Sequence, residues 1–579
     1  MKKYLGLIFV ICCFIGYFLI ENFKQKELDP IEGFFSDATD LIQPPFIHYD
    51  NKYYHRNASV VYFRSLFFAP GIAVNDLNND GYQDFVTTSS EENATPQIYL
   101  NQQGNGFKNV TKKWIKPLKR KPYESNITPL LFDYDNDQDL DLLVTAIGCS
   151  QFYLNEDNFF EYQKNHKLSK SCENNYSALI IDLDQDRKLD ILLLRYFNQR
   201  WHRTFESDDF YRVISGSPNN LFDATNGGQN QLILSSGTDI PAGKARWSFD
   251  AWQTDINNDQ IKELIVANDF GSEEFFEFKH NSFLDRTRDF IFPDRRNGMN
   301  INSNYLPNNP KPHIFISNIW IKNYVEKGNF YWHDQGNDNL TDLAIASNLN
   351  NCKWAWGSVF ADFNLDGYND SYIANGYLSS KKNKNNRKGH FQFASLSTLP
   401  FKDFFKKFPS QNFEIPLEIS ENYDSVSGNQ ADCLKIYNSE TNKFEDTSPI
   451  NGAKPIWDGR AVATIDYDND GDLDLLVTAQ NNYLHLFKNT TLEETPKTNW
   501  IGFDIKDQQF ISKITLIQGE NIYYKDWNAA KTGFLSQSDP RIHFGLLNDS
   551  NVSVSFEYSD GEVKTQQDLA PGQYYNFEL

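Results

Sequence analysis

The sequence predicts an all-β fold, a seven-bladed β-propeller, and two observations support this prediction. A short acidic motif recurs six times, each time between two apolar segments of strand-like composition. A second pair of strand-like segments follows several copies, such as residues 97–101 with 107–111 and residues 434–438 with 444–447. Four strands per repeat is the number that a propeller blade requires.

The repeated motif is Asp-x-Asp/Asn-x-Asp-x-x-x-Asp/Glu, and it predicts calcium binding. Oxygen ligands at positions 1, 3 and 5 of a tight loop converge on one point, and a carboxylate at position 9 closes the shell around a hard cation such as Ca²⁺. Up to six sites are expected. Their candidate ligands are Asp76, Asn78, Asp80 and Asp84; Asp133, Asp135, Asp137 and Asp141; Asp182, Asp184, Asp186 and Asp190; Asp255, Asn257, Asp259 and Glu263; Asp362, Asn364, Asp366 and Asp370; and Asp466, Asp468, Asp470 and Asp474.

Position 6 of the motif separates two kinds of loop. Glycine, which relieves a sharp turn, occupies this position in three copies, and Gln138, Arg187 and Gln260 replace it in the others. We expect those three loops to be strained or to bind calcium more weakly. The alternative is that the acidic turns bind nothing, and Mg²⁺ suits them less because it keeps more of its water.

The spacing of the motifs also predicts a blade that has lost its acidic loop. The interval between Asp255 and Asp362 has room for an additional repeat, and residues 298–320 resemble such a copy without the acids. Six complete repeats and this one give seven blades. Between Asp370 and Asp466 the extra length is instead an insertion, at about residues 379–430, with a Lys/Asn-rich and then a Phe-rich stretch.

The N-terminal segment predicts export of the chain. An apolar run from Tyr4 to Ile20 follows Lys2 and Lys3, and no small-residue cleavage site follows it. Residues 1–30 are therefore predicted to be an uncleaved signal anchor, a single transmembrane helix and its linker, with the remainder periplasmic or on the cell surface. The alternative is secretion after cleavage.

Charge and cysteine content restrict the kinds of partner and of metal site that the chain can have. The formal net charge of −22 argues against nucleic acid as a partner, because phosphate backbones attract basic surfaces. Four cysteines lie outside the apolar run, with no zinc-type spacing: Cys149, Cys172, Cys352 and Cys433. They form either disulfides, with Cys149–Cys172 the first candidate, or buried thiols.

One group of side chains is a candidate ligand site. Aromatic and basic residues precede three of the acidic loops, and at equivalent inner-strand positions they would approach one end of the central channel. The alternative is that they pack between blades. The candidates are Arg246, Trp247, Trp354, Trp356, Trp457 and Arg460. No nucleophile, metalloprotease or phosphate-loop motif is present, and the sequence names no catalytic residue.

The repeats and the tail together resemble a known family. The acidic repeat with its following hairpin (IYLN…GNGFKNVT) is similar to the FG-GAP/VCBS repeats of bacterial propeller proteins and integrin α-subunits. Residues 499–501, 533–546 and 555–562 resemble the ASPIC/UnbV domain. The combination resembles the cartilage acidic protein family and its bacterial relatives, although the Gly-Ala-Arg segment usual in that tail is absent between Lys506 and Leu516.

The resemblance implies a propeller over residues 31–496, with integrin-α-like calcium loops, and a small β-rich domain over residues 497–579. It also implies binding or adhesion with no established chemistry. We therefore expect a non-catalytic recognition protein whose partner is an extracellular or periplasmic protein or polysaccharide. The alternative is a polysaccharide lyase or hydrolase with its site at the channel mouth.

Overall fold

The computed structural model describes residues 35–577, apart from several segments. These are residues 50–69, 123, 173, 184, 186, 196–219, 223–246, 270–271, 280–281, 292–295, 321–326, 337–338, 378–429, 448–455, 495–496, 506–509 and 528–532. The predicted anchor, the predicted insertion, Asp184, Asp186 and Arg246 therefore lie outside the described residues. Among the described residues, no helix is long and apolar enough to cross a membrane.

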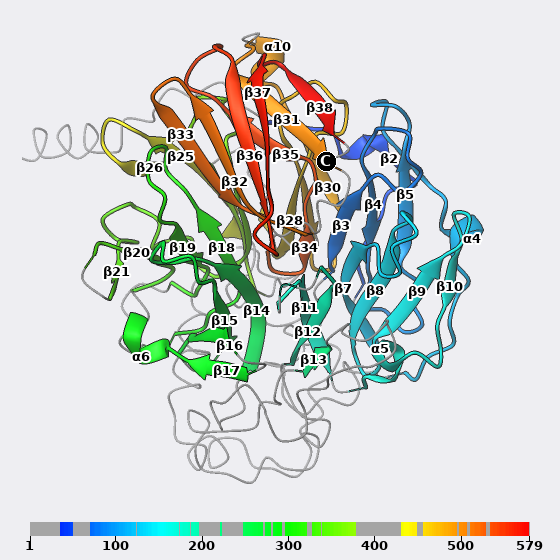
Figure 1. Ribbon diagram of the computed structural model, residues 1–579. Helices are drawn as coiled ribbons and strands as arrows, with labels where there is room; N and C mark the ends of the chain where they lie inside the picture. Colours follow the sequence, from blue (N-terminus) through cyan, green and yellow to red (C-terminus); the bar gives the residue numbers. More distant parts are fainter. Residues whose placement is uncertain are drawn as a thin grey trace, which may run out of the picture.

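The prediction of an all-β fold is confirmed, since short antiparallel sheets follow one another along the chain (Figure 1). The first sheets contain β3 (Ile72–Asn75), β4 (Asp84–Thr87), β5 (Gln97–Asn101) and β6 (Phe107–Asn109); β7 (Ser125–Phe132), β8 (Asp141–Ile147), β9 (Gln151–Asn155) and β10 (Phe160–Tyr162); β11 (Asn175–Ile181), β12 (Asp190–Arg195) and β13 (Asn220–Phe222); and β14 (Trp247–Thr254), β15 (Glu263–Asp269), β16 (Glu274–Lys279) and β17 (Ser282–Asp285).

Three further sheets continue the series. They contain β18 (Ile301–Asn304), β19 (His313–Ile316), β20 (Phe330–Asp334) and β21 (Leu340–Asp342); β22 (Ala355–Ala361), β23 (Asp370–Asn375), β25 (Cys433–Asn438) and β26 (Lys443–Asp446); and β28 (Gly459–Ile465), β29 (Asp474–Ala479) and β30 (His485–Asn489) with β1 (Phe35–Asp37). Smaller elements are η1 (Thr39–Leu41), β2 (Ile42–Gln43), β24 (Gln430–Ala431), β27 (Ile456–Trp457), α4 (Thr111–Trp114), α5 (Lys167–Lys170), α6 (Thr287–Phe290) and α10 (Thr491–Glu494).

The first strands of these sheets meet around one core and close a ring. Contacts run in order from β3 through β7, β11, β14, β18, β22 and β28 and then return to β3. Strand β1 completes the last sheet by pairing with β30, with Phe35 opposite Asn489. The beginning and the end of the ring are thereby joined by backbone hydrogen bonds, which close the circular array.

The segment predicted to have lost its acidic loop forms an ordinary pair of strands. Residues 298–320 contain β18 and β19, and the turn between them, residues 305–312, has no acidic side chain. Its sheet occupies a place in the ring between β14 and β22. Loss of the acids therefore leaves the strand pairing intact.

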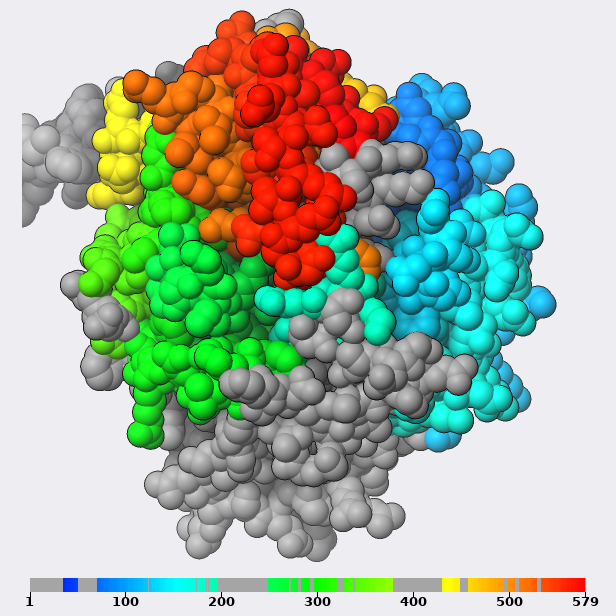
Figure 2. All heavy atoms as spheres, in the orientation of Figure 1, coloured from blue at the N-terminus to red at the C-terminus, as the bar shows by residue number. Residues whose placement is uncertain are grey.

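A tail domain follows the ring as two packed sheets. One contains β35 (Ile542–Gly545), β31 (Trp500–Ile505) and β38 (Gln573–Phe577), and the other contains β33 (Asn521–Asp526), β32 (Ile511–Gln518), β36 (Val552–Tyr558) and β37 (Val563–Leu569). Figure 2 shows this domain, in orange and red, lying across the ring.

One segment of the tail domain enters the centre of the ring. Strand β34 (Ser536–Gln537) pairs in parallel with β3, and Gln537 exchanges two hydrogen bonds with the backbone of Leu131, at 2.8 and 2.9 Å. Phe534 is fully buried against the rings of Tyr176 and Trp356, at 5.9 and 5.5 Å between centroids. The tail is therefore part of the core of the ring.

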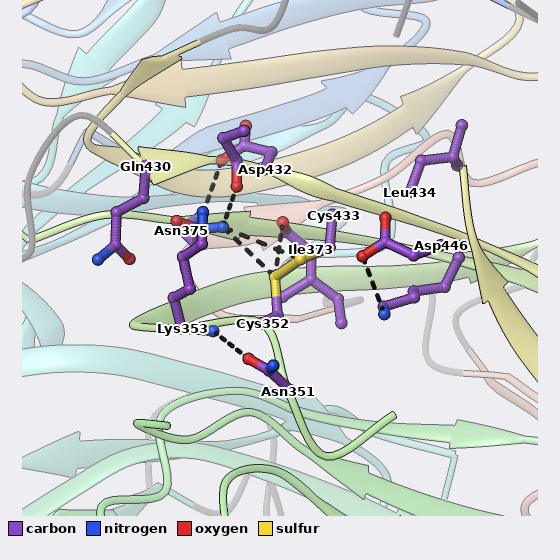
Figure 3. The surroundings of a disulfide bond; sticks show 12 residues. Asn351, Cys352, Lys353, Ile373, Asn375, Gln430, Asp432, Cys433, Leu434 and Asp446 are labelled. Carbon is purple, nitrogen blue, oxygen red and sulfur yellow. Dashed lines mark hydrogen bonds and ion pairs between the residues drawn. A yellow bond between two sulfur atoms is a disulfide. The ribbon is translucent and has the colours of Figure 1, made fainter. Parts of the chain in front are cut away.

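Two disulfides link segments of the ring. The predicted Cys149–Cys172 bridge is present, and Cys352 is joined to Cys433. Figure 3 shows the second bridge beside Asn375, whose backbone amide donates to Asp432 Oδ1 at 2.7 Å. It joins the segment before β22 to the start of β25, so it spans the predicted insertion.

Phe534→Ala tests the contribution of the tail to the core of the ring. Truncation leaves a cavity among Tyr176, Phe249 and Trp356, and we expect the free energy of unfolding to fall by about 3–5 kcal/mol. The matched control is Val563→Ala, a tail residue that is 56% exposed, which should change stability by less than about 0.5 kcal/mol. Chemical denaturation of the full chain measures both, and equal effects would show that Phe534 is not a core residue.

Candidate metal sites

The six acidic loops occupy equivalent places in the ring, each between the first and second strand of a sheet. In the first loop, the amides of Asp80 and Gly81 donate to the two carboxylate oxygens of Asp76, at 3.2 and 2.7 Å. The same pattern joins Asp470 and Gly471 to Asp466, at 3.2 and 3.1 Å. The carboxylate at position 1 therefore organises the loop around itself.

The carboxylate at position 9 ties the loop to the rest of its sheet. Asp474 Oδ2 accepts the amide of Tyr467 at 3.1 Å, and Oδ1 accepts the amide of Asn489, in the third strand, at 2.7 Å. Asp84 makes the same two bonds to Leu77 and Asn101. Each carboxylate oxygen has two lone pairs, so these bonds leave capacity for a cation.

Position 6 is left-handed whatever residue occupies it. Gly81, Gly367 and Gly471 have φ of 85°, 87° and 99°, and Gln138 and Gln260 have φ of 76° and 72°. A side chain is disfavoured there by roughly 1–2 kcal/mol because its Cβ crowds the backbone. The loops without glycine thus carry the strain that their sequence predicts.

The ligands available in these loops suit calcium. They are all oxygens, and in the second and sixth loops at least three carboxylates approach within 4.8 Å of one another: Asp133, Asp135 and Asp141, and Asp466, Asp468 and Asp474. Asp468 Oδ1 is buried and has no hydrogen-bond partner. An unsatisfied buried carboxylate oxygen among other carboxylates fits a cation.

Burial makes the charged form of the loop carboxylates electrostatically unfavourable. Desolvation raises the pKa of Asp84 and Asp141 to about 8, despite the backbone amides that each accepts. It raises the pKa of Glu263 to about 8 and that of Asp474 well above its ordinary value, and neighbouring loop carboxylates add to both shifts. A bound cation would remove this penalty because it favours the charged form.

The tail domain contacts the first carboxylate of several loops. The Tyr574 hydroxyl donates to Asp466 Oδ2 at 2.8 Å. The backbone of Gly545 lies so close to the fifth loop that a Cβ there would be 1.8 Å from Asp362 Oδ2. In the third loop, the Ser559 hydroxyl donates to Asp182.

Other tail contacts reach the flanks of the same loops. Arg187 of the third loop forms ion pairs with Asp560 and Glu562. Lys262, beside the fourth loop, donates to Ser512 O at 2.9 Å, and His543 contacts Gly471 O at 2.9 Å. The tail domain therefore lies on the face of the ring that carries the acidic loops.

The side chains proposed as a ligand site lie in the interior. Trp356 and Arg460 are fully buried, with the guanidinium carbon 4.6 Å from the centre of the Trp356 ring. Trp354 stacks on Tyr377 at 4.2 Å, and Trp457, 8% exposed, donates from Nε1 to Asp432. Trp247 belongs to β14, and Arg246 is not described. The described members fill the core and offer no open surface to a ligand.

Sequence reasoning missed two acidic residues beside the sixth loop. Asp472 and Glu493 form a further group with Asp470, again with carboxylate oxygens within 4.8 Å of one another. Asp472 occupies position 7, where the motif uses only the backbone carbonyl, and Glu493 lies in α10, after the repeat. The sequence could have indicated Asp472, because it is an acid at a motif position whose side chain has no role in the loop site.

Comparison with known proteins supports the resemblance found in the sequence. The profile of the FG-GAP-like repeat matches residues 76–144, that of the FG-GAP repeat matches residues 459–491, and that of ASPIC and UnbV matches residues 511–578. The chain carries FG-GAP repeats and an ASPIC/UnbV domain. These modules indicate an extracellular protein of the adhesion or recognition type, and they are not typical catalytic domains.

Curated relatives of low sequence identity agree with the resemblance to the cartilage acidic protein family. Cartilage acidic protein 1 of Xenopus tropicalis is 22% identical over 42% of this chain and 40% of that protein. The Homo sapiens protein is 23% identical over 42% and 39%. The matches thus span about two-fifths of each relative. The match to the crystal structure of BBS1N in complex with ARL6DN covers 79% of this chain and 98% of that chain, with 9% identity and a TM-score of 0.40.

The raised carboxylate pKa values predict how the metal-free protein responds to pH. A carboxyl whose pKa is higher in the folded protein than in the unfolded chain stabilises the fold. This contribution is complete when the pH is below the pKa of the unfolded chain, and it is lost as the pH rises towards the folded pKa of about 8. From pH 6.8 to 8.0, metal-free protein should therefore lose on the order of 1 kcal/mol per such carboxyl. Calcium-saturated protein should change much less.

Thermal melting of the full chain at several pH values in this window measures the difference. The ordinary pKa of histidine is about 6.5, so unfolded histidines are partly protonated at the lower end of this window, but their contribution is the same with and without calcium and cancels in the comparison. Parallel pH profiles with and without calcium would contradict the assignment of these carboxyls to the metal loops.

Proposed function

We propose that the protein is a calcium-binding, extracytoplasmic recognition protein built on a seven-bladed β-propeller, and that it binds a protein or polysaccharide without catalysis. Calcium occupies up to six loops and stabilises the scaffold. The apolar segment Tyr4–Ile20 anchors the chain as a single-pass membrane protein, with the ring outside the cytoplasm.

The observation that carries this proposal is the common geometry of the acidic loops. In all six loops the first carboxylate accepts at least one amide from within its loop. In four of them the ninth carboxylate also accepts an amide from the third strand of its sheet. Oxygen-only donor sets at these places support calcium, and the repeat and tail modules support recognition outside the cell.

The arrangement of the tail domain bears on where a partner binds. On the loop face, Phe534 and β34 occupy the centre of the ring. The recognition surface is therefore formed by the outer strands and connecting loops of the sheets, where connections carry binding residues in many scaffolds.

A screen of the full chain against polysaccharides and candidate surface proteins tests the proposed function. Binding and product release are measured separately, with calcium and with a chelator. We expect binding that requires calcium, because the loops hold the scaffold, and no release of product. Release of shortened or unsaturated sugars would establish the enzymatic alternative instead.

A further inference from the structure

The sixth acidic loop has a buried carboxylate at position 7. The corresponding residues of the other loops are Tyr82, Asp139, Lys188, Ile261 and Tyr368, and in the sixth it is Asp472. Asp139 is partly exposed, whereas Asp472 has no exposed surface. Position 7 serves a calcium loop through its backbone carbonyl, so a buried carboxylate there has no role in the loop site itself.

The carboxylate of Asp472 is incompletely satisfied. Its Oδ2 accepts the amide of Leu492 at 3.0 Å, and its Oδ1 has no hydrogen-bond partner although it is buried. Burying a charged oxygen without a partner costs several kcal/mol unless a counter-charge is close. The nearest acids make the deficit larger, because Asp470 and Glu493 bring their own carboxylates within 4.8 Å.

These distances suit a cation. Calcium–oxygen distances are about 2.3–2.6 Å, so two ligands on opposite sides of one ion lie about 4.8 Å apart. Three carboxylates within that separation can all contact a single ion. Asp470 also belongs to the loop site, and a carboxylate with two oxygens can bind a different ion with each.

The net charge around the loop points to the same conclusion. Lys488 Nζ lies 2.6 Å from both Asp468 Oδ2 and Glu493 Oε1 and 3.7 Å from Asp470 Oδ2. Arg541 is paired with Asp539. One divalent ion in the loop and Lys488 together supply three positive charges. They face six carboxylates, namely Asp466, Asp468, Asp470, Asp472, Asp474 and Glu493.

We propose that the sixth loop holds two divalent cations, with the second bound by Asp470, Asp472 and Glu493 beside the loop ion. The ligands are hard oxygens, so the second ion is calcium or an ion of similar chemistry. Glu493 is 46% exposed in its side chain and gives the ion access from solvent, while buried Asp472 fixes its position. This second site rests on the proposed occupancy of the loop by calcium.

Bound calcium per chain, measured by equilibrium dialysis of the full chain at about 1 mM free calcium, tests the proposal. Glu493→Gln and Asp472→Asn should each lose one equivalent relative to the unchanged chain. Glu493 lies at the surface, so its variant tests the site without endangering the fold. Asp139→Asn is the matched control, since it removes an acid at the same motif position outside such a group, and it should lose none.

The outcomes separate the two proposals. Loss of one equivalent in Glu493→Gln and Asp472→Asn, but not in Asp139→Asn, supports the second ion. If Glu493→Gln binds as many calcium ions per chain as the unchanged protein, the second ion is ruled out, whereas the proposed loop sites are unaffected. Absence of bound calcium from the unchanged chain overturns the loop sites themselves. Repeating the dialysis with magnesium distinguishes the ion that the second site takes.

Discussion

The structure depends on carboxylates that are buried where the first strand of a sheet turns into the second. Asp466 and Asp474 have no exposed surface, and Asp84 and Asp370 are buried equally well. Water cannot solvate these groups, so the loops must supply other partners for their charge. Backbone amides supply part of the compensation, and the proposed cations would supply the remainder.

The tail domain is built onto the same carboxylates. Tyr574 and Ser559 donate hydroxyl hydrogen bonds to the first acids of two loops, and the backbone at Gly545 packs against a third. The tail also enters the ring through β34 and Phe534. Changes in charge at the loops therefore act on the contact between the two parts of the protein, and not on the ring alone.

Much of the fold was predictable because its signal is local and repeated. The acidic motif identifies the turn between two strands, and its copies give the order of sheets, including the β18–β19 pair that lacks the acids. The Cys149–Cys172 bridge followed from closeness in sequence. The glycines at position 6 indicated a sharp turn, and residues that replace them, such as Gln138, also adopt positive φ there, because the turn geometry is the same in every copy.

The failures of sequence reasoning concern contacts between distant segments. Trp356 and Arg460 form a pattern that suits either a ligand surface or a core. In the structure Phe534, far along the chain, packs against Trp356, and Arg460 lies over the Trp356 ring. A two-residue strand such as β34 has no periodicity from which to predict it. Asp472 and Glu493 converge only because α10 folds back onto the sixth loop.

The most direct test of calcium in the loops is the thermal melting of the full chain at constant pH, with saturating calcium and after its removal by a chelator. Each occupied loop couples metal binding to folding, so the account predicts a large rise in melting temperature with calcium. Equal melting temperatures would contradict it, because the acidic loops would then be turns whose burial is compensated without a metal.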